Sequence, residues 1–141
     1  MLRSFAVSLW LLAPAACTSL HKPRAPTARD EETLALGAEL FWRSLRWGDY
    51  DAASSLFQEA EPRLGFLERW TTAPPVQITD YQIVHIELTG GADASPGGLV
   101  VVKVERIDAG TASVGLDMIR QTWYREGEHW YLDPGSAPFG E

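Results

Sequence analysis

The hydrophobic pattern of this chain changes its period at the adjacent prolines Pro74 and Pro75. Before them, from residue 30, apolar residues recur with the spacing of helices that have one buried face. After them, apolar residues recur at every second position, which is the period of strands. Proline lacks a backbone N–H and disfavours helical conformation in the preceding residue, so the pair ends the helical part. The sequence therefore predicts an α+β fold, with helices first and an antiparallel sheet after them.

The helical part predicts three helices, of which the first is the longest. It is expected from about Asp30 to Trp47, and Gly48 suits the end of such a helix. Asp49 can accept hydrogen bonds from the free amides that open the second helix, and a third is expected from Pro62 to Trp70. The apolar stripe of the first helix consists of Leu34, Ala38, Phe41, Trp42 and Leu45. The residues that the later helices are expected to bury are Ala53, Leu56, Phe57, Leu64, Leu67 and Trp70.

The alternating part predicts a curved sheet of four strands joined by short turns, an antiparallel meander. The expected strand ranges are 76–88, 99–107, 112–126 and 129–133. The two faces of the first strand are expected to carry Val84, Ile86 and Leu88, and Tyr81, Ile83, His85 and Glu87. Gly115 lies inside the third strand, where glycine often marks a bulge or bend. Such a bend would let the sheet wrap around the helices.

The first residues have the three parts of an export signal. A positive charge at Arg3 is followed by an apolar run from Phe5 to Ala13 and then by small residues. This run of nine residues is shorter than the roughly 20 that a helix needs to cross a bilayer. We therefore expect residues 1–16 to be a signal peptide that is removed, and not a membrane span.

The single cysteine of the chain, Cys17, directly follows this leader. An unpaired cysteine in an exported protein indicates intermolecular pairing or special chemistry. The segment Ala15-Ala16-Cys17 resembles the bacterial lipobox, which implies cleavage before Cys17 and attachment of lipid to its sulfur. The alternative is an ordinary secretory leader that leaves Cys17 as a free thiol. The lipobox interpretation predicts a protein anchored in the bacterial cell envelope, on the periplasmic face of the outer membrane.

Composition sets the domain organisation and narrows the partners. Residues 17–29 contain prolines without apolar periodicity, which predicts a flexible tether. One domain is expected over residues 30–134, followed by a C-terminal tail over 135–141. The formal net charge of −7 argues against a nucleic-acid partner. Because the chain has one cysteine and three histidines that lie far apart in sequence, neither a metal ion nor a cofactor is expected.

Two segments resemble the NTF2-like, or cystatin-like, superfamily, and in particular small bacterial lipoproteins with that fold. In "FWRSLRWGDYDAASSLF", residues 41–57, a long helix meets a second one through Gly-Asp-Tyr. In "TWYREGEHWYLD", residues 122–133, a tight turn joins two aromatic strands. With the linking strands, the likeness covers residues 30–133. The resemblance implies a cone whose open end can hold a small apolar molecule, serve an enzyme or pack against another protein.

Isomerases and dehydratases of this superfamily use a tyrosine or aspartate as hydrogen-bond donor and an aspartate or histidine as base inside the cone. This sequence does not reproduce that pattern clearly, so the resemblance assigns no catalytic residue. Polar groups on the expected strand faces remain candidates, with aromatic side chains that could line a ligand cavity. The candidate pocket residues are Phe41, Trp42, Tyr81, His85, Asp117, Gln121 and Trp123. For Asp117 the alternative is an ion pair, for which the candidate bases are Arg120, Arg106 and Lys103.

Two classes of function remain open at this point. The first is a lipid-anchored envelope protein whose domain is a non-enzymatic binding or assembly module, with an envelope protein, a small apolar ligand or a second copy of the chain as partner. It predicts a filled cone and an exposed apolar patch near the rim. The second is a carrier of a small apolar molecule, or an isomerase- or dehydratase-like enzyme. It predicts an empty cavity of at least ~300 Å³ with a buried carboxylate or histidine of shifted pKa.

Overall fold

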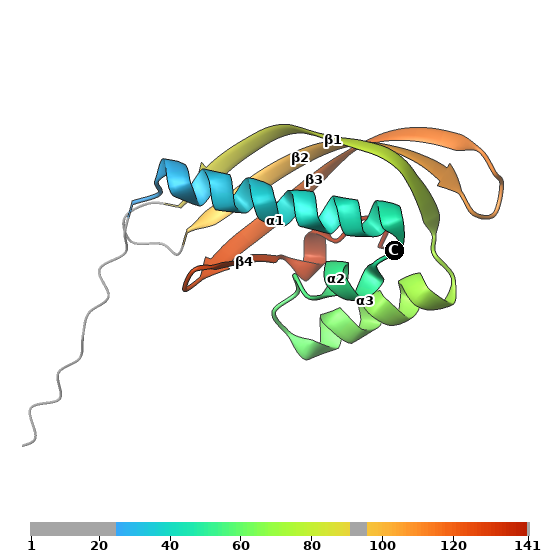
Figure 1. Cartoon of the computed structure of the whole chain (residues 1–141), viewed down its shortest axis with the longest axis horizontal. Helices are drawn as coiled ribbons and strands as arrows, with labels where there is room; N and C mark the ends of the chain where they lie inside the picture. Colours follow the sequence, from blue (N-terminus) through green and yellow to red (C-terminus); the bar gives the residue numbers. More distant parts are fainter. Residues whose placement is uncertain (1–24, 91–95, 141) are drawn as a thin grey trace, which may run out of the picture.

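The computed structural model describes residues 25–90 and 96–140, in which three helices pack on a four-stranded antiparallel sheet (Figure 1). The helices are α1 (Ala28–Trp47), α2 (Tyr50–Ser54) and α3 (Ala60–Thr72). The strands are β1 (Val76–Thr89), β2 (Gly97–Asp108), β3 (Val114–Glu126) and β4 (His129–Leu132), and they neighbour one another in chain order. Since β1 begins directly after Pro75, the α+β fold that the change of period predicts is confirmed.

Helix α1 crosses beneath the curved sheet and has the predicted buried stripe (Figure 1). At its start, a carboxylate oxygen of Asp30 accepts the backbone N–H of Thr27 at 2.7 Å. At its end, Gly48 adopts φ 73°, a left-handed conformation that glycine tolerates, and the Asp49 N–H donates to the Ser44 carbonyl at 2.8 Å. All members of the stripe are buried, as predicted: Leu34, Ala38, Phe41, Trp42 and Leu45.

The second and third helices depart from the prediction. Helix α2 ends at Ser54, so Phe57 is buried from a loop, and the Arg63 guanidinium holds this loop by donating to the Phe57 carbonyl at 2.8 Å. Helix α3 buries Phe66 and Trp70, which are four residues apart and share a face. The predicted burial of Leu64 is wrong: it precedes Phe66 by two residues, faces away from the core and is 63% exposed.

Strand β1 contains two β-bulges that simple alternation does not predict. The pairing of β1 with β2 shifts between Ile78 and Asp80, and again between Ile83 and His85. Each shift moves the following side chains to the opposite face. The side chains that pack against the core are therefore Val76, Ile78, Tyr81, Ile83, Ile86 and Leu88. The expectation that His85 shares a face with Tyr81 and Ile83 is wrong for this reason, and His85 is exposed.

The bulge expected at Gly115 is also absent from the pairing of β2 with β3, which runs without a shift. Gly115 lies opposite Arg106, and a Cβ added to it would lie only 2.9 Å from the Arg106 Cζ. The glycine therefore makes room for a guanidinium on the inner face of the sheet. The bulges of this sheet lie in β1 instead.

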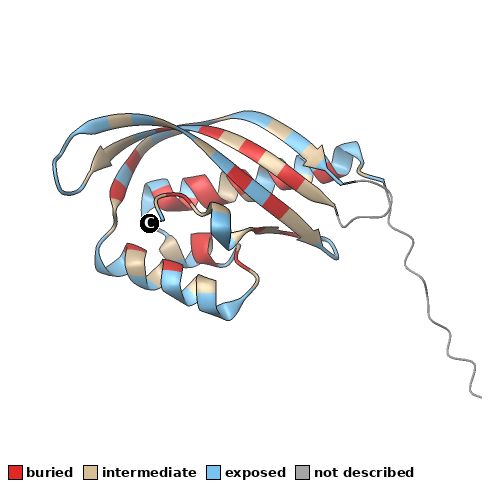
Figure 2. Ribbon diagram, turned by 180° about the vertical axis from the view of Figure 1, so that it is seen from behind, coloured by how far each residue is buried: buried red, intermediate tan, exposed pale blue. Residues whose placement is uncertain are grey.

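The core lies between α1, α3 and the inner face of the sheet, where buried positions alternate along β2 and β3 (Figure 2). The residues after β4 also contribute to it. Their Phe139 ring lies edge-on to Trp70 at 6.3 Å between centroids and beneath the Arg106 guanidinium at 5.9 Å. The segment expected to be a tail thus packs against the domain. No helix within the described ranges is long and apolar enough to span a membrane.

Candidate functional site

The interior of the cone is filled by four of the seven candidate residues. Phe41, Trp42, Gln121 and Trp123 are all fully buried. The indole N–H of Trp42 donates to the Gln121 side-chain oxygen at 2.9 Å. Phe41 lies edge-on to Trp42 and to Trp123, with centroid distances of 5.6 and 6.4 Å. These contacts make the four residues part of the packed core.

Tyr81 lies at the border of this core. Its ring stacks on Trp42 at 6.5 Å between centroids, and its hydroxyl donates to a carboxylate oxygen of Glu39. Burial and the acceptance of this hydrogen bond by Glu39 raise the pKa of Tyr81 to about 12. The phenol is therefore held neutral and is a weak acid near neutral pH.

The two candidate acid–base residues lie apart from each other and from the aromatic core. His85 is on the outer face of β1, where its Nε2 lies 3.5 Å from a Glu87 carboxylate oxygen. Asp117 is on the inner face of β3 and accepts a hydrogen bond from the Arg106 Nε, so the ion pair with Arg106 is the alternative that the structure shows.

Arg106 donates a second time, to Asp108. This partner lowers the pKa of the Asp108 carboxyl, while hydrogen bonds to Asp117 and then Asp108 raise the pKa of Arg106. The cluster thus places two carboxylates around one guanidinium and carries a net formal charge of −1. Within residues 25–90 and 96–140, no group of three or more histidine, cysteine, aspartate or glutamate side chains is placed to hold a metal ion.

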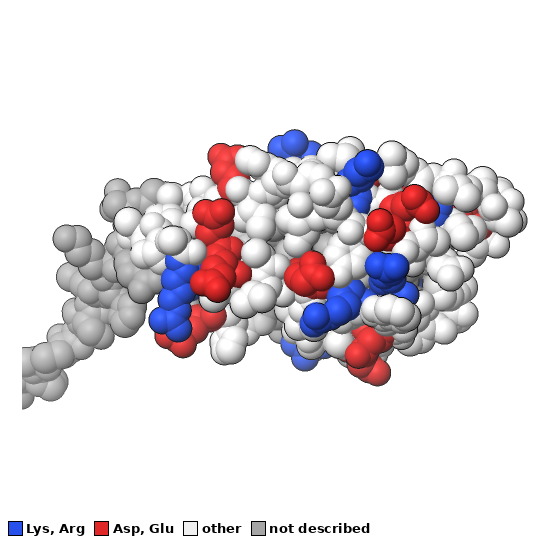
Figure 3. Space-filling model, turned by 45° about the horizontal axis from the view of Figure 1, so that its top comes forward, with Lys and Arg blue, Asp and Glu red and all other residues white. Residues whose placement is uncertain are grey.

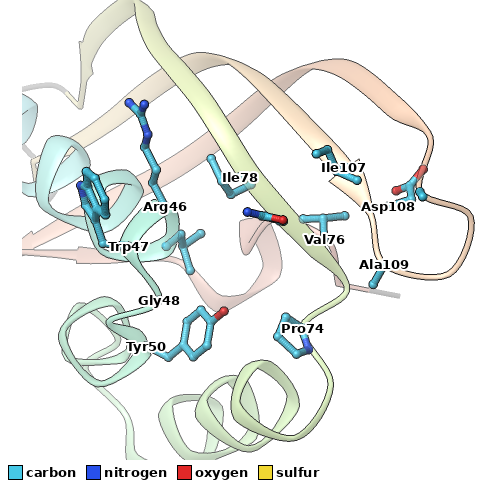
Figure 4. A pocket seen from close by; sticks show the side chains of 13 residues that line it. Arg46, Trp47, Gly48, Tyr50, Pro74, Val76, Ile78, Ile107, Asp108 and Ala109 are labelled. Carbon is cyan, nitrogen blue, oxygen red and sulfur yellow. The ribbon is translucent and has the colours of Figure 1, made fainter.

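An open cavity lies at one end of the cone, and we call it the rim cleft (Figure 4). It has a volume of about 590 Å³ and opens to solvent between the end of α1, Tyr50, the start of β1 and the turn after β2. The apolar lining comes from Leu45, Trp47, Tyr50, Pro74, Val76, Ile78, Ile107, Ala109 and Ala112. The polar side-chain groups are Arg46, Gln77, Asp108 and the Tyr50 hydroxyl, and polar atoms make up about half of the exposed lining. A concavity that combines apolar side chains with a few placed polar groups is the usual form of a small-molecule site.

Two side chains give the rim cleft its character. Trp47, the last residue of α1, is 76% exposed, and the Arg46 guanidinium lies 5.8 Å from the centre of its ring. The same guanidinium lies 3.4 Å from a carboxylate oxygen of Asp80. On the opposite wall, the Tyr50 ring packs on Trp70 at 5.5 Å, and its hydroxyl points across the cleft toward β1 (Figure 4).

The charges around the molecule are mixed. In the view of Figure 3, acidic and basic side chains alternate over the surface and no large region of one sign is present on that face. Electrostatic attraction of a highly charged partner therefore has no support there. The rim cleft is distinguished by its volume and by the exposed Trp47 ring at its border.

None of the seven candidate residues lines the rim cleft. The cleft draws on four segments far apart in sequence, and alternation within one segment cannot show that they meet. One signal in the sequence could have indicated it: Trp47 falls outside the apolar stripe of the first helix, directly before the glycine that ends it. A single exposed apolar residue is common on protein surfaces, so this signal gains meaning only from the cleft that Trp47 borders.

The sequence matches no protein-family model and no curated protein. Solved structures, however, share its architecture. A protein of unknown function with a cystatin-like fold from Nostoc punctiforme is 16% identical, with a TM-score of 0.51 over 75% of this chain and 87% of its own. ActVI-ORFA from Streptomyces coelicolor is 13% identical, with a TM-score of 0.51 over 72% of this chain and 90% of its own.

The β subunit of benzoate 1,2-dioxygenase from Burkholderia mallei is also 13% identical, with a TM-score of 0.50 over 77% of this chain and 87% of its own. At such identities a structural likeness speaks for the fold and not for the activity. The resemblance seen in the sequence is confirmed at this level: the chain has a cystatin-like, or NTF2-like, α+β fold.

Proposed function

We propose that this protein is a non-enzymatic binding module of the bacterial cell envelope, and that its rim cleft holds a small, mainly apolar molecule. The observation that carries the proposal is the contrast between a packed interior and an open cleft of mixed polar and apolar lining, bordered by the exposed Trp47 ring. The volume of the cleft, about 590 Å³, lies within the range of small-molecule sites, about 300–1,000 Å³.

The polar groups of the rim cleft favour binding over catalysis. Its one carboxylate, Asp108, has its pKa lowered by the hydrogen bond from Arg106, which makes it a weak base. His85 and Asp117 lie elsewhere. The Tyr50 hydroxyl and the Gln77 amide can both donate and accept hydrogen bonds, which suits orientation of a ligand. A catalytic role would call for a base of raised pKa beside the ligand.

A neutral apolar dye tests the cleft directly. Phenylnaphthylamine fluoresces in apolar surroundings, so titration of the folded domain measures its dissociation constant. We expect Trp47→Ala to weaken binding about tenfold, because loss of a large aromatic contact removes 1–2 kcal/mol of binding free energy. The matched control is Leu36→Ala, which removes another exposed apolar side chain of α1 away from the cleft. If both variants bind the dye like the wild type, the rim cleft is not the site.

The proposed anchor is the lipid on Cys17, which lies outside the described residues. The first described helix nevertheless suggests an orientation for such an anchor. Helix α1 has 20 residues and is about 30 Å long at ~1.5 Å per residue, and its far end forms one wall of the rim cleft. If a tether joins the lipid to the start of α1 at Ala28, that end of the helix lies nearer the membrane. The rim cleft, at the other end of α1, then lies on the side away from the membrane. With the signal peptide that the leader predicts, this orientation is consistent with a cleft that faces the periplasm, and the outer membrane is part of the proposal.

The anchor has its own experiment, independent of the dye. The full-length gene is expressed in a bacterium beside a Cys17→Ala variant, and intact mass and membrane partitioning are measured. We expect the wild type to carry the mass of the lipid and to fractionate with membranes, and the variant to lose both. Two soluble proteins of unmodified mass would overturn the anchor while leaving the rim cleft to be judged by the dye.

A further inference from the structure

A second concavity, which we call the tail pocket, lies between α3 and the residues that follow β4. It has a volume of about 280 Å³ and shares no residue with the rim cleft. Trp70 lies between the two, since it contacts Tyr50 of the rim cleft at 5.5 Å and Phe66 of the tail pocket at 5.6 Å. The apolar lining of the tail pocket consists of Phe57, Pro62, Phe66, Pro134 and Ala137.

One charged side chain, Arg69, lines this pocket, whose exposed lining is about half polar and half apolar. Arg69 is one of four half-buried arginines among the described residues. The side chains of the other three donate hydrogen bonds to protein acceptors. Arg63 donates to two backbone carbonyls, and Arg106 and Arg125 each donate to carboxylates. Arg69 differs from them because its side chain has no acceptor within residues 25–90 and 96–140, although its Nε is buried. A buried N–H of a charged group without an acceptor is unfavourable.

Its place in the helix explains only part of this arrangement. Arg69 lies in the last turn of α3, where a positive charge is favourable near the free carbonyls. An exposed side chain would serve that purpose equally well and would keep its donors hydrated. The position of Arg69 beside Phe66 and Ala137 instead presents a guanidinium with free donors to this pocket.

We propose that the tail pocket is a second binding site, separate from the rim cleft, and that it takes a small apolar carboxylic acid. A carboxylate can accept two parallel hydrogen bonds from the two terminal nitrogens of an arginine and compensate its charge, and no acceptor within the described residues occupies those donors of Arg69. The hydrocarbon part of the acid would lie against Phe57, Phe66 and Ala137. About 280 Å³ corresponds to roughly nine water volumes of ~30 Å³, so an acid with about ten heavy atoms fits.

Octanoate and its neutral counterpart octanamide test the proposal without any substitution. They have the same chain length, and octanamide lacks the charge that Arg69 would recognise. Isothermal titration calorimetry on the folded protein at neutral pH is expected to show octanoate binding about tenfold or more tightly than octanamide. Equal affinities, or no binding of octanoate at millimolar concentration, would overturn the proposal.

Substitutions then locate the site. Arg69→Gln is expected to abolish the preference for octanoate, and Arg69→Lys to retain part of it, because lysine keeps the charge but not the fork. The matched control is Arg120→Gln, which removes one positive charge from the exposed outer face of β3 and should leave the preference unchanged. An equal loss in both glutamine variants would attribute the effect to net charge and overturn the assignment.

Two further readouts separate this site from the rim cleft and from a folding defect. Octanoate should shift the backbone NMR signals of Gly65 and Ala137, which line the tail pocket, and should bind Trp47→Ala like the wild type. Perturbation of the rim cleft alone would overturn the tail pocket. If Arg69→Gln does not fold, the Lys variant and the comparison of octanoate with octanamide still decide the question.

Discussion

Two tryptophans of α1, five residues apart, show how differently the interior and the rim cleft use the same side chain. Trp42 is fully buried, and its indole N–H donates to Gln121. Trp47 is 76% exposed at the border of the cleft, where its ring makes a cation–π contact with the Arg46 guanidinium. Five residues along a helix correspond to 500°, or 140° around the axis, so the two rings face different surroundings.

The difference shows which region of the molecule is filled by packed side chains and which has space for a ligand. In the interior, aromatic rings contact one another, and space for a ligand would require displacing them. At the rim, the same kind of side chain remains exposed although its burial would be favourable by itself. The exposed Trp47 ring beside a concavity of about 590 Å³ is what we expect of a site that is covered when a ligand is present.

The largest expected effect comes from substituting these tryptophans one at a time. Trp42→Ala should lower the free energy of unfolding by about 3–5 kcal/mol, because it leaves a cavity and removes the donor to Gln121. Trp47→Ala should change it by no more than about 0.5 kcal/mol. Urea unfolding followed by circular dichroism measures both, and Trp42→Phe gives a milder interior change if Trp42→Ala does not fold. Equal losses at the two positions would show that Trp47 is structural and would break the comparison.

The interior was largely predictable from the sequence, because the helical spacing of apolar residues in α1 shows which face of this helix is buried. All five stripe positions, from Leu34 to Leu45, are buried as the spacing predicts. The errors arise where a local irregularity changes the period or where a neighbouring residue packs better. The bulges of β1 place His85 on the outer face, and the pair Phe66 and Trp70 leaves Leu64 outside the core.

The two cavities were not predictable in the same way. Each is enclosed by segments that are separated along the chain, and their meeting depends on the tertiary arrangement. The role of Arg69 has no sequence signal at all, because its lack of an acceptor is known only when every neighbour is placed. Trp47 had a weak signal, as a bulky apolar residue outside the stripe.

A pair of glycines tests the border between the interior and the rim cleft. Arg106 lies there, since it joins Asp117 of the inner face to Asp108 of the cleft. Gly115→Ala would place a Cβ 2.9 Å from the Arg106 Cζ, and the forced shift should destabilise the fold by about 1 kcal/mol. Gly110→Ala, in the turn between β2 and β3, meets no atom within 4 Å and should change stability by less than about 0.5 kcal/mol.

Thermal and urea unfolding of the two glycine variants measures the difference. A destabilised Gly115→Ala protein that still binds phenylnaphthylamine would show that the Arg106 cluster supports the interior and not the ligand. If Gly115→Ala no longer binds the dye but keeps its free energy of unfolding, the Arg106 cluster is part of the rim cleft. The border between the interior and the cleft then lies at Arg106. Equal stability of both variants would mean that Arg106 relocates without cost.

The last comparison concerns pH, and it tests the border residue Tyr81 of the packed interior. Tyr81, stacked on Trp42, has a folded-state pKa of about 12 against an ordinary value of 10.0. At a pH between these values the unfolded chain loses the phenolic proton while the folded chain keeps it, so unfolding becomes more favourable. The stabilisation is fully present below pH 10 and should be lost as pH rises through about 12.

A Tyr81→Phe variant isolates this contribution. Burial also raises the pKa of Tyr124, which gives a dependence of the same sign in both proteins, so the difference between wild type and variant is the relevant quantity. We expect Tyr81→Phe to have a lower free energy of unfolding than the wild type below pH 10, because the substitution removes the hydrogen bond to Glu39. Above pH 10 its free energy of unfolding should fall less steeply with pH than that of the wild type. Urea midpoints measured in steps of pH provide the curves. Parallel curves would mean that the Tyr81 hydroxyl has the same pKa in the folded and the unfolded protein. In that case Tyr81 would not belong to the packed interior, which would extend only to Trp42.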